Sequence, residues 1–275
     1  MDAIPSLFGI SGKVAVVTGG GGVLCSAMCQ ALAEAGAKVA VLDLLPEAAQ
    51  RVAGQITDHH QEAIGLGCDV LDLDSIDKAA RFVLQAFGQV DILVNGAGGN
   101  KKQATTSADL HFFDLPRQAL EQVFDLNMIG TLLPCQVFGR QMAEQGEGVI
   151  VNISSMNALR PLTRIPAYSA AKAAVSNFTQ WLAVHLAQEY SPKIRVNAIA
   201  PGFFLTEQNR YLLTDPQTGE WTTRGQQIIS HTPQGRLGAP EDLLSTLLWL
   251  VSPGASFVSG VVVPVDGGFS AFSGV

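Results

Sequence analysis

The sequence predicts an α/β fold in which a doubly wound parallel sheet of seven strands lies between helices on both faces, as a three-layer sandwich. Short runs rich in β-branched residues alternate with longer helical stretches, which is the order that a parallel sheet requires. Most of these runs read as continuous apolar stretches and do not alternate between apolar and polar residues, as is typical of strands covered on both faces. No repeat and no linker rich in Pro, Gly or Ser divides the chain, so we expect one domain over residues 1–275.

The expected elements follow from these runs in chain order. We expect strands at Val14–Thr18, Lys38–Asp43, Ala63–Cys68, Asp91–Asn95, Gly148–Ser154, Ile194–Ala200 and Gly260–Pro264. The helical stretches between them are Ser26–Ala35, Pro46–Ile56, Ser75–Phe87, Leu120–Gln145, Ala167–Glu189 and Pro240–Val251.

Two irregular excursions interrupt this order, at about 99–116 and 203–239. They begin where the fourth and sixth expected strands end. Ligands of such folds bind beyond the carboxyl ends of the strands, so we expect both excursions to form walls of a substrate pocket. The alternative is that they are surface loops without a role.

The composition excludes several classes of function. The chain has 17 Lys and Arg against 24 Asp and Glu, which gives a formal net charge of −7. This acidic balance argues against a nucleic-acid-binding protein, which would carry a basic face. No apolar stretch approaches the roughly 18 residues of a membrane-spanning helix, and residues 1–12 lack the Lys or Arg that begins a signal peptide. We therefore expect a cytoplasmic protein that binds neither nucleic acid nor membranes.

Charge and cysteine usage both indicate extensive burial. Charged residues make up 15% of the chain, against roughly 25% in typical soluble domains, which favours a large core or buried contacts between subunits. The cysteines lack metal-site spacing and are expected to be buried free thiols; they are Cys25, Cys29, Cys68 and Cys135. No bound metal is expected.

The first expected strand runs into a glycine-rich turn, residues 19–22. Such a turn lets the backbone approach a pyrophosphate, whose charge the amides at a helix start stabilise. The second strand ends at Asp43, where a carboxylate would accept hydrogen bonds from the adenosine ribose and repel a 2′-phosphate. The nearest cation beyond it is Arg51. The pattern favours NAD(H) over NADP(H), with helix capping as the alternative role of Asp43.

Tyr168 and Lys172 stand four residues apart, on one face of an expected helix. A phenol titrates near 10, but a neighbouring ammonium would lower its pKa and allow the pair to move a proton to or from a substrate oxygen. Ser155 follows the preceding strand and could hydrogen-bond to the same oxygen. Alone, a Tyr and Lys at this spacing usually form a solvated helix face, but the glycine-rich turn, Asp43 and Ser155 in order disfavour that alternative.

These motifs together resemble the short-chain dehydrogenases/reductases. The resemblance spans Gly12 to Gly268 and implies a Rossmann-type fold and an NAD(H)-dependent oxidoreductase that interconverts a keto group and a secondary alcohol. It implies a homotetramer joined through the helices at about 120–145 and 167–189. The motifs that carry it are Thr18-Gly19, Cys68-Asp69-Val70, Asn95-Gly96-Ala97-Gly98, Asn127, Ser155, Tyr168 with Lys172, Pro201-Gly202 with Thr206, and Asp266-Gly267-Gly268.

The resemblance also implies roles for single residues. Tyr168 would be the acid/base, Ser155 would orient the carbonyl, Lys172 would fix the ribose and lower the pKa of Tyr168, and Asn127 would hold a water of a proton relay. The cofactor would contact Gly19, Gly21, Gly22, Val23, Leu24, Asp43, Leu44, Asp69, Val70, Asn95, Gly96, Ala97, Tyr168, Lys172, Pro201, Gly202 and Thr206. Val23 and Cys25 stand where the family normally has glycine, so Gly21 and Gly22 would supply the turn.

Within the family, the chain is most similar to a subgroup described as D-mannonate oxidoreductases or fructuronate reductases, in runs such as Ser154–Asn157 and Pro201–Arg210. This implies a sugar-acid substrate, which needs a cationic or amide-rich group for its carboxylate. The first candidates for that group are Asn157, Arg164, Gln208, Asn209 and Arg210, followed by Asn100, Lys101, Arg160 and His231. Each arginine alone could instead be a surface or interface charge. The alternative functions are a gluconate-type or 3-oxoacyl reductase and, in another class, a non-catalytic nucleotide-binding protein.

Overall fold

Seven parallel strands form one sheet in the order β3-β2-β1-β4-β5-β6-β7, in a computed structural model that describes residues 6–206 and 210–274. This is the strand order of a doubly wound, Rossmann-type fold, so the predicted fold class is confirmed. The strands are β1 (Val14–Thr18), β2 (Lys38–Asp43), β3 (Ala63–Gly67), β4 (Ile92–Asn95), β5 (Gly148–Ile153), β6 (Ile194–Pro201) and β7 (Val262–Val265).

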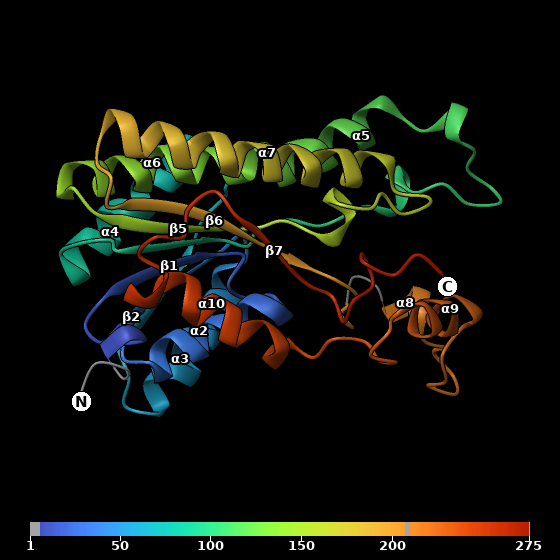
Figure 1. Cartoon of the computed structure of the whole chain (residues 1–275), viewed down its shortest axis with the longest axis horizontal. Helices are drawn as coiled ribbons and strands as arrows, with labels where there is room; N and C mark the ends of the chain where they lie inside the picture. Colours follow the sequence, from blue (N-terminus) through green and yellow to red (C-terminus); the bar gives the residue numbers. More distant parts are fainter. Residues whose placement is uncertain (1–5, 207–209, 275) are drawn as a thin grey trace.

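Helices cover both faces of this sheet, as Figure 1 shows. The helices α2 (Val23–Glu34), α3 (Pro46–Asp58) and α10 (Leu244–Val251) lie on one face. The helices α4 (Leu73–Phe87), α6 (Gly130–Gln145) and α7 (Pro166–Glu189) lie on the other. Every residue of β1 and of β6 is buried, because both faces of these central strands pack against helices. The expectation of two-sided apolar strands therefore holds.

The predicted helix Leu120–Gln145 is wrong as a single element. The chain instead forms α5 (Arg117–Phe124), a π-helical turn at Asp125–Ile129, and then α6. Asn127 lies in that turn, and its side-chain Nδ2 donates to the Val123 backbone oxygen over 2.7 Å. A side chain that donates to a backbone carbonyl in this way competes with the backbone hydrogen bonds of a regular α-helix. The interruption places Asn127 at the end of the sheet where the strands β4 and β5 finish.

The excursion 203–239 contains two helices that the sequence analysis did not predict, α8 (Arg210–Leu213) and α9 (Thr223–His231). Both lie beyond the carboxyl ends of the strands, apart from the layered body (Figure 1). The excursion 99–116 forms only short 3₁₀ turns, at Lys102–Ala104 and Phe112–Asp114. Among the residues described, no helix is long and apolar enough to cross a membrane.

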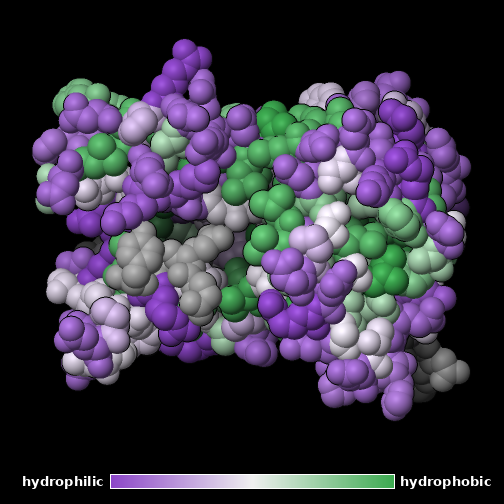
Figure 2. Space-filling view, turned by 180° about the vertical axis from the view of Figure 1, so that it is seen from behind, coloured by the Kyte–Doolittle hydropathy of each residue, from purple (hydrophilic) through white to green (hydrophobic). Residues whose placement is uncertain are grey.

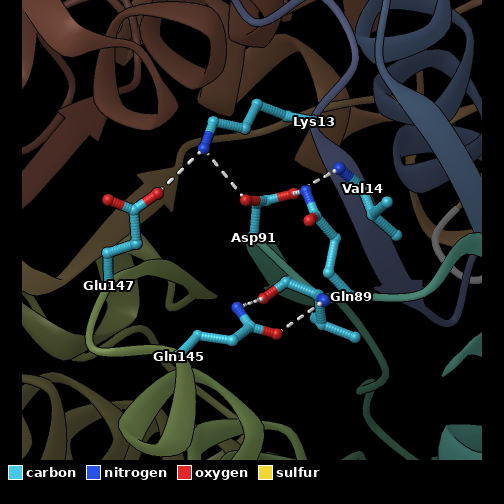
Figure 3. A network of polar contacts seen from close by, with 7 residues as sticks. Lys13, Val14, Gln89, Asp91, Gln145 and Glu147 are labelled. Carbon is cyan, nitrogen blue, oxygen red and sulfur yellow. Dashed lines mark hydrogen bonds and ion pairs between the residues drawn. The ribbon is translucent and has the colours of Figure 1, made fainter.

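At the amino edge of the sheet, a polar network ties three strands together (Figure 3). The Lys13 ammonium contacts Asp91 Oδ1 at 2.9 Å and Glu147 Oε1 at 3.1 Å. Asp91 Oδ2 accepts hydrogen bonds from the Val14 backbone nitrogen at 2.8 Å and from Gln89 at 2.7 Å. These contacts join the beginnings of β1, β4 and β5, so they fix the edge opposite to the excursions.

Candidate active site

A cavity of about 640 Å³ opens at the carboxyl edge of the sheet. Its walls come from the glycine-rich turn, from the ends of β2, β4, β5 and β6, and from both excursions. Seen from behind, the molecule is hollowed between two lobes, with hydrophobic side chains gathered near the middle of the face (Figure 2). The predicted site residues in its walls are Gly19, Gly21, Gly22, Val23, Leu24, Asp43, Gly96, Ala97, Ser155, Asn157, Tyr168, Lys172, Pro201, Gly202 and Thr206.

Other predicted residues lie near this edge but outside the cavity walls; they are Leu44, Asp69, Val70, Asn95, Asn127, Arg164 and Arg210. Val70 is buried and packs against Gly130, where an added Cβ would meet Val70 Cγ2 at 2.9 Å. Asn95 Nδ2 donates to Asn152 Oδ1 at 2.9 Å, a contact between β4 and β5. Gln208 and Asn209 fall outside the described residues.

The glycine-rich turn leaves no room for side chains. Gly19 has a φ of +65°, and a Cβ on it would lie 2.8 Å from Ala97 Cα. A Cβ on Gly21 would lie 2.9 Å from Asp43 Oδ2. The departure at Cys25 is accommodated because Gly96 opposite has no side chain, and a Cβ there would collide with the Cys25 sulfur. The backbone of the turn therefore forms the floor of the cavity.

Asp43 is fixed against this floor. Its Oδ2 accepts from the Gly21 backbone nitrogen at 3.0 Å and its Oδ1 from the Leu45 backbone nitrogen at 3.1 Å. The second bond lies just before α3, so the carboxylate also braces the start of that helix. Arg51 reaches the same place, with Nη2 donating to the Gly21 oxygen at 3.3 Å. In the sequence Arg51 is only the nearest cation beyond Asp43, but its position on α3 brings it to the cavity wall.

Ser155, Tyr168 and Lys172 meet at the other end of the cavity. The Tyr168 hydroxyl is hydrogen-bonded to Ser155, and Ser155 Oγ accepts from the Asn157 backbone nitrogen at 3.2 Å. Lys172 is only 3% exposed. Its Nζ donates to the Ile153 backbone oxygen at 2.7 Å and lies 5.7 Å from the centre of the Tyr168 ring.

The electrostatics of this pair differ from the prediction that Lys172 lowers the pKa of Tyr168. Burial of the hydroxyl raises the pKa of Tyr168, and the hydrogen bond with Ser155 only partly offsets this. Burial also lowers the pKa of Lys172, to about 8. Desolvation penalises the charged form of both groups, and the ammonium is held by Ile153 and not by the phenol oxygen.

Asn127 is fully buried behind the cavity wall. Its Nδ2 donates to the Gly99 oxygen at 2.7 Å and its Oδ1 accepts from the Gly99 nitrogen at 3.1 Å. A Cβ on Gly98 would lie 2.8 Å from Asn127 Oδ1 and 3.2 Å from Lys172 Nζ. Asn127, which lies in the π-helical turn, therefore comes close to Lys172 because Gly98 has no side chain that would fill the place between them.

The end of the cavity beside Ser155 holds amide and cationic groups. Asn157 is 6% exposed, and its Oδ1 has no hydrogen-bond partner among the described residues. Arg164 is exposed, with a backbone φ of +77°, and Arg160 donates to the Ser270 oxygen at 3.2 Å. Arg224, on α9, lines the cavity. Sequence reasoning missed Arg224, because nothing in the irregular excursion marks it.

Comparison with known proteins identifies the family. Residues 13–217 match the model of the short chain dehydrogenases. The chain belongs to this family. It is an NAD(P)-dependent oxidoreductase that acts on CH–OH groups, as its relatives of the same family also indicate.

Three relatives illustrate the range of this short-chain dehydrogenase's neighbours. The uncharacterized oxidoreductase UxuB of Bacillus subtilis is 48% identical over 99% of this chain and 100% of its own. A Haemophilus influenzae protein solved with bound NAD, provisionally assigned as a D-mannonate oxidoreductase, is 47% identical with a TM-score of 0.91, over 99% of this chain and 100% of that one. A gluconate 5-dehydrogenase from Burkholderia cenocepacia, solved with NADP and tartrate, is 29% identical with a TM-score of 0.87, over 98% and 99% of the chains.

The cavity fits a nicotinamide dinucleotide. The floor at Gly19 and Gly21 is a cradle that any Cβ would fill, which is what close approach of a pyrophosphate requires. Asp43 stands at one end of the same cavity, and Tyr168 and Lys172 at the other. One cavity therefore brings together the Asp43 carboxylate, the glycine-rich turn and the Tyr168 and Lys172 side chains.

Proposed function

We propose that this enzyme uses NAD(H) to interconvert a keto group and a secondary alcohol on a sugar acid, with D-fructuronate and D-mannonate as the first pair to test. The observation that carries the proposal is one cavity that holds the Ser155–Tyr168 pair beside Asn157, whose buried Oδ1 has no hydrogen-bond partner in the described part of the chain. An unpaired buried amide oxygen is costly unless a ligand hydroxyl satisfies it. The provisional assignment of the Haemophilus relative supports the same substrate class.

In this proposal Tyr168 is the acid/base. Burial raises its pKa, so the phenol is protonated at neutral pH and can donate its proton to a carbonyl oxygen. Ser155 Oγ, bonded to Tyr168, would orient that oxygen. Bound NAD(H) supplies or accepts the hydride. In the oxidative direction, the same residues take the proton from the alcohol.

Lys172 and Asn127 act behind this pair. The Lys172 ammonium is held by the Ile153 oxygen and lies 5.7 Å from the centre of the Tyr168 ring. In this proposal its charge would stabilise a phenolate after proton transfer, although burial keeps the pKa of Tyr168 raised. Asn127 holds the loop at Gly99, and both Asn127 and Lys172 approach the place that a side chain on Gly98 would occupy. We assign Asn127 a positioning role at the proton-transfer end.

The preference for NAD(H) rests on Asp43. Its carboxylate lines the cavity and would repel a 2′-phosphate while accepting hydrogen bonds from ribose hydroxyls. Arg51 lies in the same wall and is the group that would favour NADP(H), as cations do in that position. Both kinds of cofactor occur in the solved relatives, NAD in one and NADP in another.

The test of the reaction uses the purified protein with D-fructuronate and NADH, with NADPH in parallel. We expect oxidation of NADH, followed by its absorbance, and a loss of about 10²–10⁴-fold in kcat for Tyr168→Phe. Phe keeps the ring packing, so the melting temperature of the variant should stay close to that of the wild type. Turnover equal in wild type and variant would exclude Tyr168 as the acid/base. No turnover of D-fructuronate would exclude this substrate.

We also propose that the chain acts as one domain within a homo-oligomer, with a tetramer favoured. The outer face of α7 exposes Trp181 and Val184, each 57% accessible. Trp181 stacks on Phe178 at 6.2 Å and on His185 at 4.7 Å. Large apolar rings gathered on one exposed helix face favour contact with another subunit. Light scattering coupled to size exclusion would measure the mass, and a monomer at assay concentration would contradict the proposal.

A further inference from the structure

Arg224 faces the cavity from a rigidly anchored helix start. It is the second residue of α9 and is half-buried. Thr222, just before the helix, accepts from the Gly225 nitrogen at 3.1 Å and donates to the Leu212 oxygen of α8 at 2.7 Å. A Cβ on Gly225 would lie 2.5 Å from the Leu213 oxygen. These contacts hold the backbone on both sides of Arg224 against α8.

The Arg224 guanidinium has no hydrogen bond or ion pair with any described residue. By contrast, the surface arginines Arg117 and Arg236 are paired with Glu121 and Asp242. Burial lowers the pKa of Arg224, and the charge of Arg164 lowers it further. A half-buried cation next to a second cation, and without a counter-charge from residues 6–206 or 210–274, is an unfavourable arrangement that a bound anion would stabilise.

Asn157 supplies an independent observation in the same cavity. More than nine-tenths of it is buried, it belongs to the cavity wall, and its Oδ1 lacks a partner among the described residues. Its backbone nitrogen donates to Ser155 Oγ, which holds the backbone of Asn157 beside the hydroxyl pair. The cavity thus presents a hydrogen-bonding group close to the reacting oxygen and a cation from the α8–α9 lobe.

We propose that Arg224 binds the carboxylate of the substrate while Asn157 hydrogen-bonds one of its hydroxyl groups. The inference rests on the proposed function for the reaction, and it requires an anionic polyhydroxy acid as the substrate class. Arg164 adds positive potential at the same place. The chain carries a net charge of −7, so attraction of an anion must come from local cations such as these.

The experiment compares Arg224→Gln and Arg224→Lys with Arg81→Gln, an exposed arginine of α4, as the matched control. D-Fructuronate is assayed against D-fructose, which lacks the carboxylate. We expect Arg224→Gln to lower kcat/KM for D-fructuronate at least 100-fold, while the rate with D-fructose and the KM for NADH change less than threefold. Arg224→Lys should give an intermediate loss, because an ammonium keeps the charge but not the bidentate geometry.

A second readout does not depend on turnover. D-Mannonate added with NAD⁺ should raise the melting temperature of the wild type and of Arg81→Gln, but not that of Arg224→Gln. If no keto acid is turned over and this shift is nevertheless lost in Arg224→Gln, the proposed reaction fails and the inference stands. An unchanged KM for D-fructuronate in Arg224→Gln would overturn the inference and leave the reaction intact. A raised KM for NADH alone would assign Arg224 to the cofactor, and the absence of any shift in the wild type would also overturn the inference.

Discussion

The two edges of the sheet differ in whether their buried polar groups have hydrogen-bond partners. At the amino edge, Lys13, Asp91 and Glu147 satisfy one another, and Asp91 also accepts from the Val14 nitrogen. At the carboxyl edge, buried polar atoms remain without partners among the described residues; they are Asn95 Oδ1, Asn100 Oδ1, Asn157 Oδ1 and Ser169 Oγ. Native proteins rarely leave such atoms unpaired.

The difference separates stability from ligand binding. The charged network of Lys13, Asp91 and Glu147 connects the starts of three strands and so fixes how they lie beside one another. No cavity opens at this edge in the described part of the chain. At the carboxyl edge, some buried polar atoms have no partner among the described residues and can bind a ligand. The same edge contains Lys172, whose charged form is disfavoured by burial. Substitutions at the first edge should therefore change stability without activity, whereas substitutions at the second should change activity.

The largest expected effect on stability is at Asp91, which is buried with three kinds of donor around it. Asp91→Ala leaves the Val14 nitrogen without its acceptor and Lys13 without its closest carboxylate. We expect a loss of about 2–4 kcal/mol in the free energy of unfolding, allowing for the partly exposed Lys13. Urea denaturation measures it, with kcat of the folded variant unchanged. Glu147→Gln, at the exposed end, should cost less than about 1 kcal/mol, and equal losses at both positions would refute a central role for Asp91.

A smaller effect is expected from the pH dependence of Lys172. Its pKa is about 8 in the folded chain and about 10.4 when unfolded. Between these values the unfolded state keeps a proton that the folded state has released, so stability rises with pH through this window. Relative to Lys172→Met, the wild type should gain roughly 2 kcal/mol between about pH 7.5 and about pH 9.5. Denaturation of both proteins at each pH gives this difference, and a pH-independent difference would mean that the folded pKa is not lowered.

The smallest effect is expected at the adenosine end. Asp43→Asn keeps a side-chain oxygen for the Gly21 nitrogen but removes the charge. We expect the ratio of kcat/KM for NADH over NADPH to fall about tenfold, which corresponds to about 1.4 kcal/mol. Arg51→Ala is the opposing variant and should reduce the use of NADPH. Steady-state kinetics with both cofactors measure the ratio, and a ratio unaffected by Asp43→Asn would remove the basis for the NAD(H) preference.

Much of the fold was predictable because its signal is local. Runs such as Val14–Thr18 and Ile194–Pro201 are mostly apolar and are buried at every position, because both of their faces are covered. Gly19, Asp43, Ser155 and Tyr168 each follow or face the end of a strand, so parallel topology alone brings them to one cavity.

The rest depends on contacts that no local pattern records. The π-helical turn follows from Asn127 bonding to Val123 and Gly99, and one of these partners lies far away in sequence. Arg224 reaches the cavity because Thr222 ties α9 to α8. The spacing of Tyr168 and Lys172 was informative, but the direction of their pKa shifts depends on burial, which spacing does not report.

The two ends of the excursion 203–239 are held together at the end of β6, and this bears on how new substrate specificities could arise. Phe204 and Gly238 form a bridge, and the Gly238 nitrogen donates to the Phe203 oxygen at 2.8 Å. The two ends are thereby pinned together at the end of β6. Since the entropy of closing a loop grows only slowly with its length, residues can be inserted or replaced between these pins at little cost to the sheet. Descendants of this chain could exchange one substrate for another there, while helix α7, which carries Tyr168 and Lys172, is inherited unaltered.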